Sequence, residues 1–103
     1  MTNLLQPWTT ARVDIGGRKL RIRCIGEGTP VVVLDAGLGG TTQDWARVQP
    51  QLGALSRTCA YNRGGYSGSD PGPQPRVASQ IVTELHTLLA NSCLPPRYVL
   101  VGH

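Results

Sequence analysis

Two stretches near the N-terminus, residues 11–15 and 18–25, alternate between apolar and polar side chains. A period of two predicts half-buried β-strands, and the Gly16-Gly17 dipeptide between them predicts a two-residue hairpin turn. The polar face of the second strand carries Lys19, Arg21 and Arg23. We expect this basic face to be solvated, because cationic side chains on an edge strand also discourage pairing with other strands.

Three later segments, 31–34, 57–62 and 98–102, predict further strands. The first of them, "VVVL", is a continuous apolar run of the kind found in strands buried on both faces of a parallel sheet. A turn is expected at 26–30 and a long polar loop follows the strand at 57–62.

Helical spacing of apolar residues predicts two helices, from about 43 to 54 and from 77 to about 91. Pro50 is expected to kink or shorten the first helix, because proline has no N–H to donate. The side chains expected to face inward are Trp45, Val48, Leu52 and Leu55 in the first helix, and Val77, Ile81, Val82, Leu85, Leu88 and Leu89 in the second. Glu84 and His86 do not lie on the predicted inward face of the second helix.

The order hairpin, strand, helix, strand, helix, strand predicts an α/β fold, with an antiparallel hairpin leading into a mostly parallel sheet that has helices on both faces. The last strand is as apolar as a central strand, yet no covering helix follows it. We therefore interpret residues 1–10 as an N-terminal extension and residues 11–103 as the N-terminal part of one domain, which a C-terminal part completes.

Composition excludes several classes of partner. The net charge is +4, and half of the ten basic residues lie between positions 12 and 23 without interleaved aromatic residues, so we expect no nucleic-acid partner. The opening "MTNLLQPWTT" lacks the features of a signal peptide, and no segment is long and apolar enough to span a bilayer. We therefore expect no membrane partner.

Cys24, Cys59 and Cys93 are odd in number and lack Cys-x-x-Cys spacing, which indicates neither a metal site nor a disulfide framework. Cys24 and Cys59 are expected to be small buried apolar residues. A reducing, cytoplasmic location fits this cysteine usage best.

Candidate chemistry gathers at the predicted carboxyl ends of the strands, in "DAGLGG" (35–40), "NRGGYSGSD" (62–70) and "GH" (102–103). In parallel sheets these ends line one crevice. One interpretation is an NADP-binding Rossmann module, with the glycine loop on a pyrophosphate and Arg63 on a 2′-phosphate. Against it, Thr42 replaces the third glycine of the motif and a hairpin precedes the loop; a P-loop is excluded because no lysine follows the glycines.

Three stretches together resemble the α/β-hydrolase superfamily, including its esterases and proline-iminopeptidase-like peptidases. They are "PVVVLDAGLGGTTQDW" (30–45), "TCAYNRGGYSGSD" (58–70) and "YVLVGH" (98–103). They are similar to that superfamily's oxyanion loop, its Tyr-Asp-x-x-Gly-x-Gly-x-Ser loop, and the run-up to its Gly-x-Ser-x-Gly nucleophile elbow. The resemblance covers nearly all of the chain from residue 11 onward and implies the N-terminal half of that fold.

The resemblance implies a serine hydrolase of esterase or aminopeptidase type, acting on a carboxylic ester or small amide without a cofactor or metal. Leu38 would be a backbone oxyanion donor, and Gly37, Gly39 and Gly40 would let the loop turn that N–H inward. Gly37 would thus belong to the catalytic loop, and Gly39 would also line the substrate pocket. Trp45 would line the substrate pocket, although core packing is its simpler role. Gly102 and His103 would directly precede the nucleophile, and the nucleophile and the rest of the triad would follow residue 103.

The chain departs from the superfamily pattern at three positions. Ala36 stands where a histidine is frequent, and Asn62 replaces the usual aspartate, which removes a charge partner from Arg63. Asp35 is equally compatible with bracing the loop through a hydrogen bond and with being a solvated strand end.

Several other polar residues are not expected to be catalytic. His103 would point into the sheet rather than act as the base, and His86 is expected to lie on the surface. Ser67 and Ser69 are expected to make loop hydrogen bonds.

The resemblance implies that serine follows "YVLVGH". The boundary after His103 has two explanations that stay open: attack of that serine hydroxyl on the His103 carbonyl, or a boundary set arbitrarily or by an unrelated protease.

The expected partners are the C-terminal remainder of the hydrolase, in one piece or as a separate chain after cleavage, and a small ester or amide substrate. Without that remainder the chain is not expected to form a stable monomer, because its apolar last strand would be an open edge. A truncated, non-catalytic fragment is the other alternative to the hydrolase.

Overall fold

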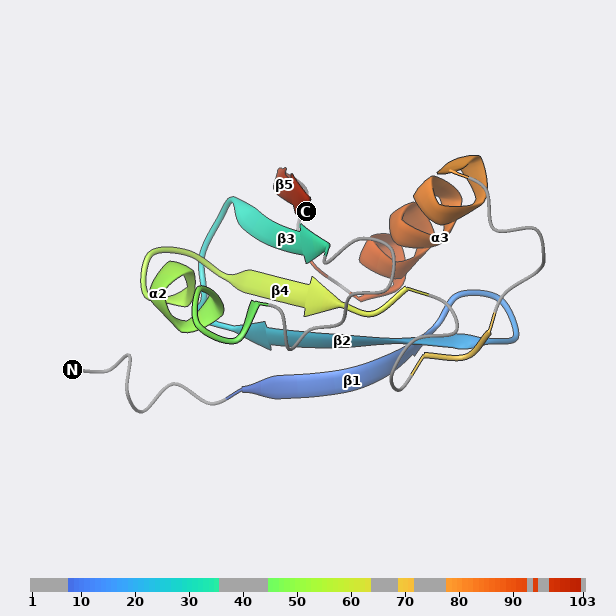
Figure 1. The fold of residues 1–103 in the computed structure, drawn as a ribbon, viewed down its shortest axis with the longest axis horizontal. Coiled ribbons are helices and arrows are strands. Elements are labelled where there is room, and N and C mark those ends of the chain that lie inside the picture. Colours follow the sequence, from blue (N-terminus) through green and yellow to red (C-terminus); the bar gives the residue numbers. More distant parts are fainter. Residues whose placement is uncertain are drawn as a thin grey trace.

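The computed structural model describes residues 8–35, 45–63, 69–71, 78–92, 94 and 97–102. They form a five-stranded sheet with two helices (Figure 1). The elements in chain order are β1 (Thr9–Asp14), β2 (Lys19–Ile25), β3 (Val31–Asp35), α2 (Gln49–Gly53), β4 (Thr58–Tyr61), α3 (Ala78–Asn91) and β5 (Tyr98–Gly102).

The strands lie in the order β1-β2-β4-β3-β5. β2 is antiparallel to both β1 and β4, whereas β3 is parallel to both β4 and β5. The predicted hairpin, the parallel strands and the α/β class are therefore confirmed. Strand order differs from chain order because the β3–α2–β4 crossover places β4 between β2 and β3.

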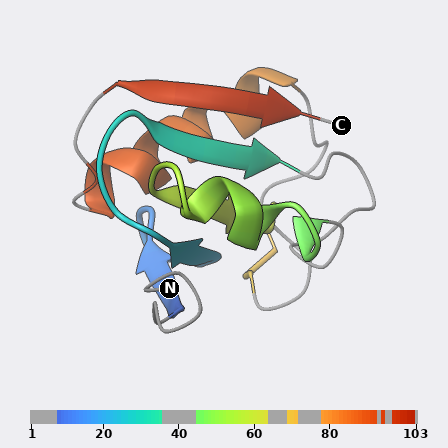
Figure 2. The same cartoon turned by 90° about the vertical axis from the view of Figure 1, so that its left-hand side faces the viewer.

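The two helices cover opposite faces of the sheet, α2 in front and α3 behind in the view of Figure 2. Neighbouring positions of a strand face opposite sides. Accordingly Ile22 of β2 belongs to the cluster that packs against α3, whereas a Cβ on Gly53 of α2 would contact Ile25. The buried cluster on the α3 face consists of Leu20, Ile22, Cys24, Val31, Val33, Cys59, Tyr61, Leu88, Leu89 and Leu94.

Helix α2 is much shorter than the helix predicted over 43–54. Pro50 lies in its first turn, the position where the missing proline N–H costs least. Val48 and Leu55, which were predicted to face inward, are 43% and 84% exposed. The buried residues of α2 are instead Gln49 and Gly53. Gln49 Nε2 donates to the carbonyls of Arg23 on β2 (2.8 Å) and Thr58 on β4 (3.0 Å).

Helix α3 has nearly the predicted bounds but presents a different face. Val82, placed in the inward stripe, is 65% exposed, whereas Glu84, placed outside it, is buried. The Glu84 carboxylate accepts from the Arg18 guanidinium at 2.5 Å and from Gln80 Nε2 at 3.2 Å. Burial of a carboxylate requires such partners, and the cation comes from the β1–β2 turn, far away in sequence.

The basic strand β2 is not a sheet edge, so the edge-protection interpretation of its cations is wrong. β2 pairs on one side with β1 and on the other with β4. Arg23 packs its guanidinium 3.9 Å from the ring centre of Trp8, a cation–π contact. The edges among the described strands are β1 and β5.

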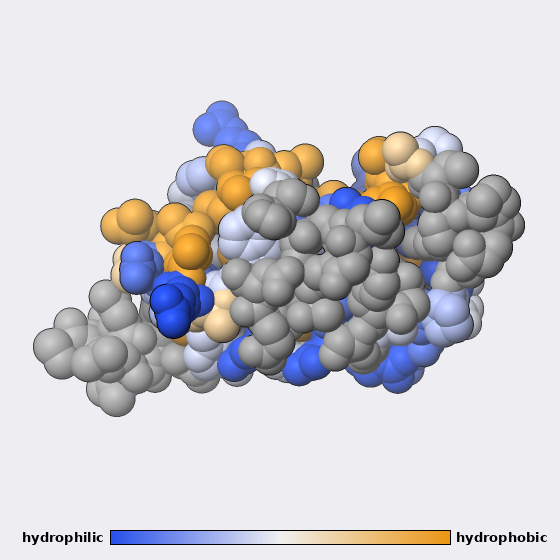
Figure 3. Space-filling model, in the orientation of Figure 1, coloured by the Kyte–Doolittle hydropathy of each residue, from blue (hydrophilic) through white to orange (hydrophobic). Residues whose placement is uncertain are grey.

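Strand β5 pairs with β3 through all five of its residues, and its other side is open in the described part of the chain. Val99 and Leu100 point to opposite faces and are 46% and 63% exposed. Figure 3 shows hydrophobic surface gathered over this strand and, separately, around α2. That a further part of the protein covers β5 stays a prediction.

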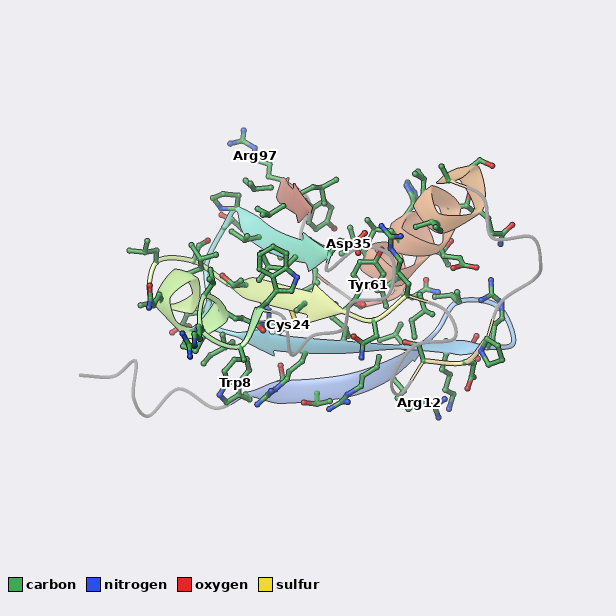
Figure 4. All side chains as sticks on the ribbon, viewed as in Figure 1. Trp8, Arg12, Cys24, Asp35, Tyr61 and Arg97 are labelled. Atoms are coloured by element: carbon green, nitrogen blue, oxygen red, sulfur yellow. A yellow bond between two sulfur atoms is a disulfide. The ribbon has the colours of Figure 1, made fainter. Side chains whose placement is uncertain are left out.

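Cys24 and Cys59 form a disulfide, which contradicts the prediction of unpaired buried cysteines (Figure 4). The pairing was hidden because the residues are 35 positions apart, yet the antiparallel β2–β4 register places them directly opposite, with Cα atoms 4.0 Å apart. This bond removes the support that cysteine usage gave to a reducing location. Among the described helices none has the length and hydropathy to cross a membrane.

Reduction of this disulfide is expected to lower the free energy of unfolding by about 3–4 kcal/mol, because the bond closes a long loop in the unfolded chain. Urea unfolding of the protein as isolated, with and without reductant, measures the change. A Cys24→Ala, Cys59→Ala double variant should be insensitive to reductant, and Cys93→Ala should respond like the parent. An unfolding midpoint that does not move when the parent is reduced would contradict the prediction.

Candidate functional site

The carboxyl ends of β3, β4 and β5 lie side by side at one edge of the sheet. Asp35, the last residue of β3, is in register with Tyr61 at the end of β4 and with Gly102 at the end of β5. This arrangement follows from the parallel pairing, because parallel strands all end on the same side. The first residues of "DAGLGG", "NRGGYSGSD" and "GH" therefore lie at one edge of the sheet. That the three stretches line one crevice stays a prediction.

The Asp35 carboxylate is the centre of a polar cluster at this edge. Arg63, two residues after β4, donates from Nε to both carboxylate oxygens (3.1 and 3.2 Å) and from one terminal nitrogen to Oδ2 (2.9 Å). The Tyr61 hydroxyl donates to the same Oδ2 at 3.2 Å. Figure 4 shows the labelled Asp35 and Tyr61 close together at the ends of β3 and β4.

Burial, together with the negative charge of Asp35, raises the pKa of the Tyr61 hydroxyl well above its ordinary value. The phenol is therefore protonated at neutral pH and acts as a donor. The hydrogen bonds to Asp35 likewise raise the pKa of Arg63. The side chains of Asp35 and Arg63 are only 20% and 22% exposed, so the ion pair is partly shielded from water. With its oxygens occupied by these donors, Asp35 is suited to positioning rather than to attacking a substrate.

The geometry excludes a solvated strand end for Asp35, whose carboxylate is hydrogen-bonded to Tyr61 and Arg63. That Asp35 braces the glycine-rich loop stays a prediction, because that loop lies outside the described residues. The ionic partner of Asp35, Arg63, lies two residues after β4, so Asp35 ties the end of β3 to the end of β4. Asn62 removes one charge partner from Arg63, and Asp35 supplies another from the neighbouring strand. The same pairing disfavours a 2′-phosphate role for Arg63, because its guanidinium is already held by a carboxylate.

A second anchor lies beyond the β4 end, where Ser69 and Asp70 pair with the part of β2 that extends past β4 (Figure 1). Ser69 Oγ accepts the Arg21 N–H at 2.8 Å and donates to the Asn62 carbonyl at 2.6 Å, as expected of a serine in a structural loop. Asp70 exchanges hydrogen bonds with the Lys19 backbone.

The Asp70 carboxylate also pairs with Arg12 of β1. The Lys19 N–H and, secondarily, the Arg12 charge lower the pKa of Asp70 below its ordinary value. Because the folded-state pKa is the lower one, this contact stabilises the fold above about pH 4 and is lost as the pH falls further.

The described residues include only some of the positions expected to form the site. Gly37, Leu38, Gly39 and His103 lie outside them, as does Ser67. Trp45 is half-buried just before α2, where its carbonyl accepts the Val48 N–H at 3.0 Å. Gly102 is exposed at the end of β5, with open space where a Cβ would stand.

His86 is exposed on α3, as predicted. Among the described residues no group of three or more histidine, cysteine, aspartate or glutamate side chains could hold a metal ion.

Sequence reasoning missed Tyr61 as a site residue and missed the Asp35–Arg63 pair. A signal was available for the pair: an acid ends one predicted parallel strand and a base follows the next. Its use requires knowing that the two strands are neighbours in the sheet, which the periodicity of either segment does not reveal.

No protein-family model matches the chain. The chain is 32% identical over 108 residues to "Probable transporter efuK" of Hormonema carpetanum, a match covering 94% of this chain and 16% of that protein. It is 38% identical over 81 residues to "Putative carbamate hydrolase RutD" of Enterobacter cloacae subsp. cloacae, covering 75% of this chain and 29% of that protein.

Two solved structures superpose closely on the fold. The Cif epoxide hydrolase of Acinetobacter nosocomialis gives a TM-score of 0.84 at 18% identity, over 93% of this chain and 30% of that one. The haloalkane dehalogenase DatA of Agrobacterium tumefaciens C58 gives 0.82 at 16% identity, over 100% of this chain and 35% of that one. These likenesses confirm the predicted fold. The chain spans between 16% and 35% of the length of these four proteins.

Proposed function

The chain has the fold of the N-terminal part of an α/β-hydrolase, and on that premise we propose that it forms the oxyanion loop and pocket wall of a serine hydrolase. The proposed substrate is a carboxylic ester or a small amide. The nucleophile and its acid and base partners would be supplied by a C-terminal remainder of the hydrolase. The curated relative named as a carbamate hydrolase supports carbonyl chemistry of this kind.

The observation that carries the proposal is the Asp35–Tyr61–Arg63 cluster at the carboxyl edge. It fixes the end of β3, from which "AGLGG" continues, against the end of β4, from which "GGYSGS" continues. Catalysis of acyl transfer needs backbone donors held rigidly where negative charge develops on the carbonyl oxygen. A shielded, bidentate ion pair at the base of the loop supplies such rigidity.

In the proposed reaction a serine hydroxyl attacks the substrate carbonyl, and its proton passes to a base in the C-terminal remainder. The Leu38 N–H would stabilise the resulting oxyanion, together with a second backbone N–H that follows the nucleophile. The alcohol or amine then leaves with that proton. Water attacks the acyl-enzyme in the second half of the cycle and releases the carboxylic acid.

A test uses the protein as isolated from its host, with any polypeptide that co-purifies. We expect hydrolysis of p-nitrophenyl acetate, and covalent labelling by a fluorophosphonate that blocks this hydrolysis. Turnover of an epoxide or a haloalkane without fluorophosphonate labelling would overturn the serine mechanism. Binding of NADP without esterase activity would favour the dinucleotide-binding alternative instead.

Asp35→Asn is expected to lower kcat/KM for the ester by roughly tenfold to a hundredfold, because a loop base displaced by about 1 Å misplaces the oxyanion donor. Steady-state kinetics measure the change. Asp14→Asn is the matched control, since Asp14 makes its hydrogen bonds to the Gly16 and Gly17 N–H groups in the hairpin turn. Equal activity of the two variants would remove the Asp35 cluster from the mechanism.

A further inference from the structure

A pocket of about 210 Å³ opens on the α3 face of the sheet, between the β1–β2 hairpin and the residues that follow α3. Its apolar walls are Ala11 and Val13 of β1, Ile22 of β2, and Leu94. Arg57, which directly precedes β4, also lines it. The pocket therefore lies at the amino end of β4, whereas the Asp35 cluster lies at its carboxyl end.

Arg57 is the one charged residue among those that line the pocket. Its Nε is buried and has no hydrogen-bond partner within the described residues. The ion pairs among the described residues join other side chains, so no carboxylate of the described residues forms an ion pair with Arg57. A buried donor without a partner is costly, and guanidinium groups match carboxylates in both charge and geometry.

The other polar groups of the pocket are already engaged within the protein. Ser92 Oγ donates to the Leu88 carbonyl at 2.5 Å, and Thr9 Oγ1 donates to the Cys24 carbonyl at 3.4 Å. The polar group of the pocket that still needs a partner is thus Arg57, and the partner that suits it is an anion. Because the neighbouring walls are apolar, they favour an anion that also carries a hydrocarbon part.

We propose that this pocket binds a short-chain aliphatic carboxylate. The carboxylate accepts hydrogen bonds from the Arg57 guanidinium, and the hydrocarbon tail packs against Ala11, Val13 and Ile22. The volume lies below the roughly 300–1,000 Å³ of sites for drug-sized ligands, which favours a small acid over a long fatty acid. The site stands independently of the proposed hydrolase activity, because it shares no residue with the carboxyl-edge cluster.

Calorimetric titration with hexanoate, hexanol and acetate tests the proposal on the protein as isolated. We expect saturable binding of hexanoate, and binding at least about tenfold weaker for hexanol, which lacks the charge, and for acetate, which lacks the tail. Amide chemical shifts of Ala11, Val13 and Ile22 should move with hexanoate. Equal affinity for hexanol, or shifts confined to other residues, would overturn the site.

Arg57→Gln is expected to weaken hexanoate binding by about tenfold or more, and Arg57→Lys by an intermediate factor, because lysine keeps the charge without the paired N–H groups. Arg47→Gln is the matched control, since Arg47 is an exposed arginine that does not line the pocket. If the Arg47 and Arg57 variants weaken hexanoate binding equally, the effect comes from the net charge of the protein, and the specific site at Arg57 is wrong.

Circular dichroism checks that each variant is folded, and Ala11→Trp, which fills the pocket, gives an independent test if Arg57→Gln fails to fold. Hexanoate binding that persists in Ala11→Trp would contradict the proposal. Binding that occurs only after deletion of residues 1–7 would also overturn it, since it would show the pocket to be occupied by the chain's own N-terminal segment.

Discussion

Replacement of Gly26 by alanine is expected to destabilise the fold by at least about 4 kcal/mol, which is most of the stability of a domain at the lower end of the usual range of about 5–15 kcal/mol. Gly26 has a φ of +88°, a conformation that alanine adopts only with strain. A Cβ at this position would also lie 2.3 Å from the Gly53 carbonyl oxygen and 2.9 Å from that of Ser56. Both obstacles are backbone atoms, so the end of α2 would have to move away from β2.

Gly16→Ala is the matched control for this substitution. Gly16 also has a positive φ, at +117°, but a Cβ there would meet no atom of the described residues within 4 Å. Alanine at this turn should therefore cost only the conformational strain, about 1–2 kcal/mol. Soluble yield and urea unfolding of the two variants measure the difference. Similar stability of Gly16→Ala and Gly26→Ala would show that the close approach of α2 does not constrain the chain.

Local periodicity was sufficient to predict the hairpin, the buried strand β3, the helix α3 and the strand β5. Each of these elements has a pattern contained within its own residues, so neighbours in sequence carry the signal. At α2 the shortening expected from Pro50 is observed, with Pro50 in the first turn, but the predicted inward face is wrong because Gln49 is buried for its amide hydrogen bonds while Val48 and Leu55 are exposed. A polar residue that bridges two strands cannot be recognised from an apolar stripe.

The pairs that hold the sheet together were not predictable in the same way. Cys24–Cys59 joins β2 to β4, which are not consecutive in sequence, and Asp35–Arg63 joins the end of β3 to the residues after β4 across the intervening helix. Arg18–Glu84 joins a turn to a helix 66 positions away. Each pair depends on the order β1-β2-β4-β3-β5, which is a property of the whole sheet. The strand ends of the candidate site were nevertheless located correctly, because parallel strands place their carboxyl ends together whatever their order.

The Asp35 cluster explains how the chain accommodates Asn62 in place of the aspartate that the superfamily pattern has at this position. Where Asn62 removes the expected carboxylate beside Arg63, the charge is restored by Asp35 from the adjacent strand. The cation therefore keeps a partner at the same edge of the sheet, while the anion moves from the end of β4 to the end of β3. This exchange accounts for an aspartate directly before the glycine-rich stretch, and it ties the end of β3 to the end of β4 through a single ion pair.

The glycine-rich stretch after Asp35 carries the largest expected effect on activity. Gly37→Val is expected to abolish ester hydrolysis, lowering kcat at least about 10²–10³-fold, the loss that follows removal of one oxyanion donor. The reason is that a β-branched side chain restricts the backbone conformations that a glycine allows. Leu38→Ala should retain most of the activity, because the proposed contribution of Leu38 is its backbone N–H, which alanine keeps.

Steady-state kinetics on p-nitrophenyl acetate, with the C-terminal remainder present, distinguish these outcomes. Loss of transition-state stabilisation should appear in kcat and kcat/KM alike, whereas a damaged binding pocket would raise KM with little change in kcat. Gly37→Ala should fall between the parent and Gly37→Val, since its side chain restricts the backbone less. If Gly37→Val and Leu38→Ala are tolerated equally well, the backbone of this loop does not stabilise the oxyanion, and the donor must come from elsewhere in the assembled protein.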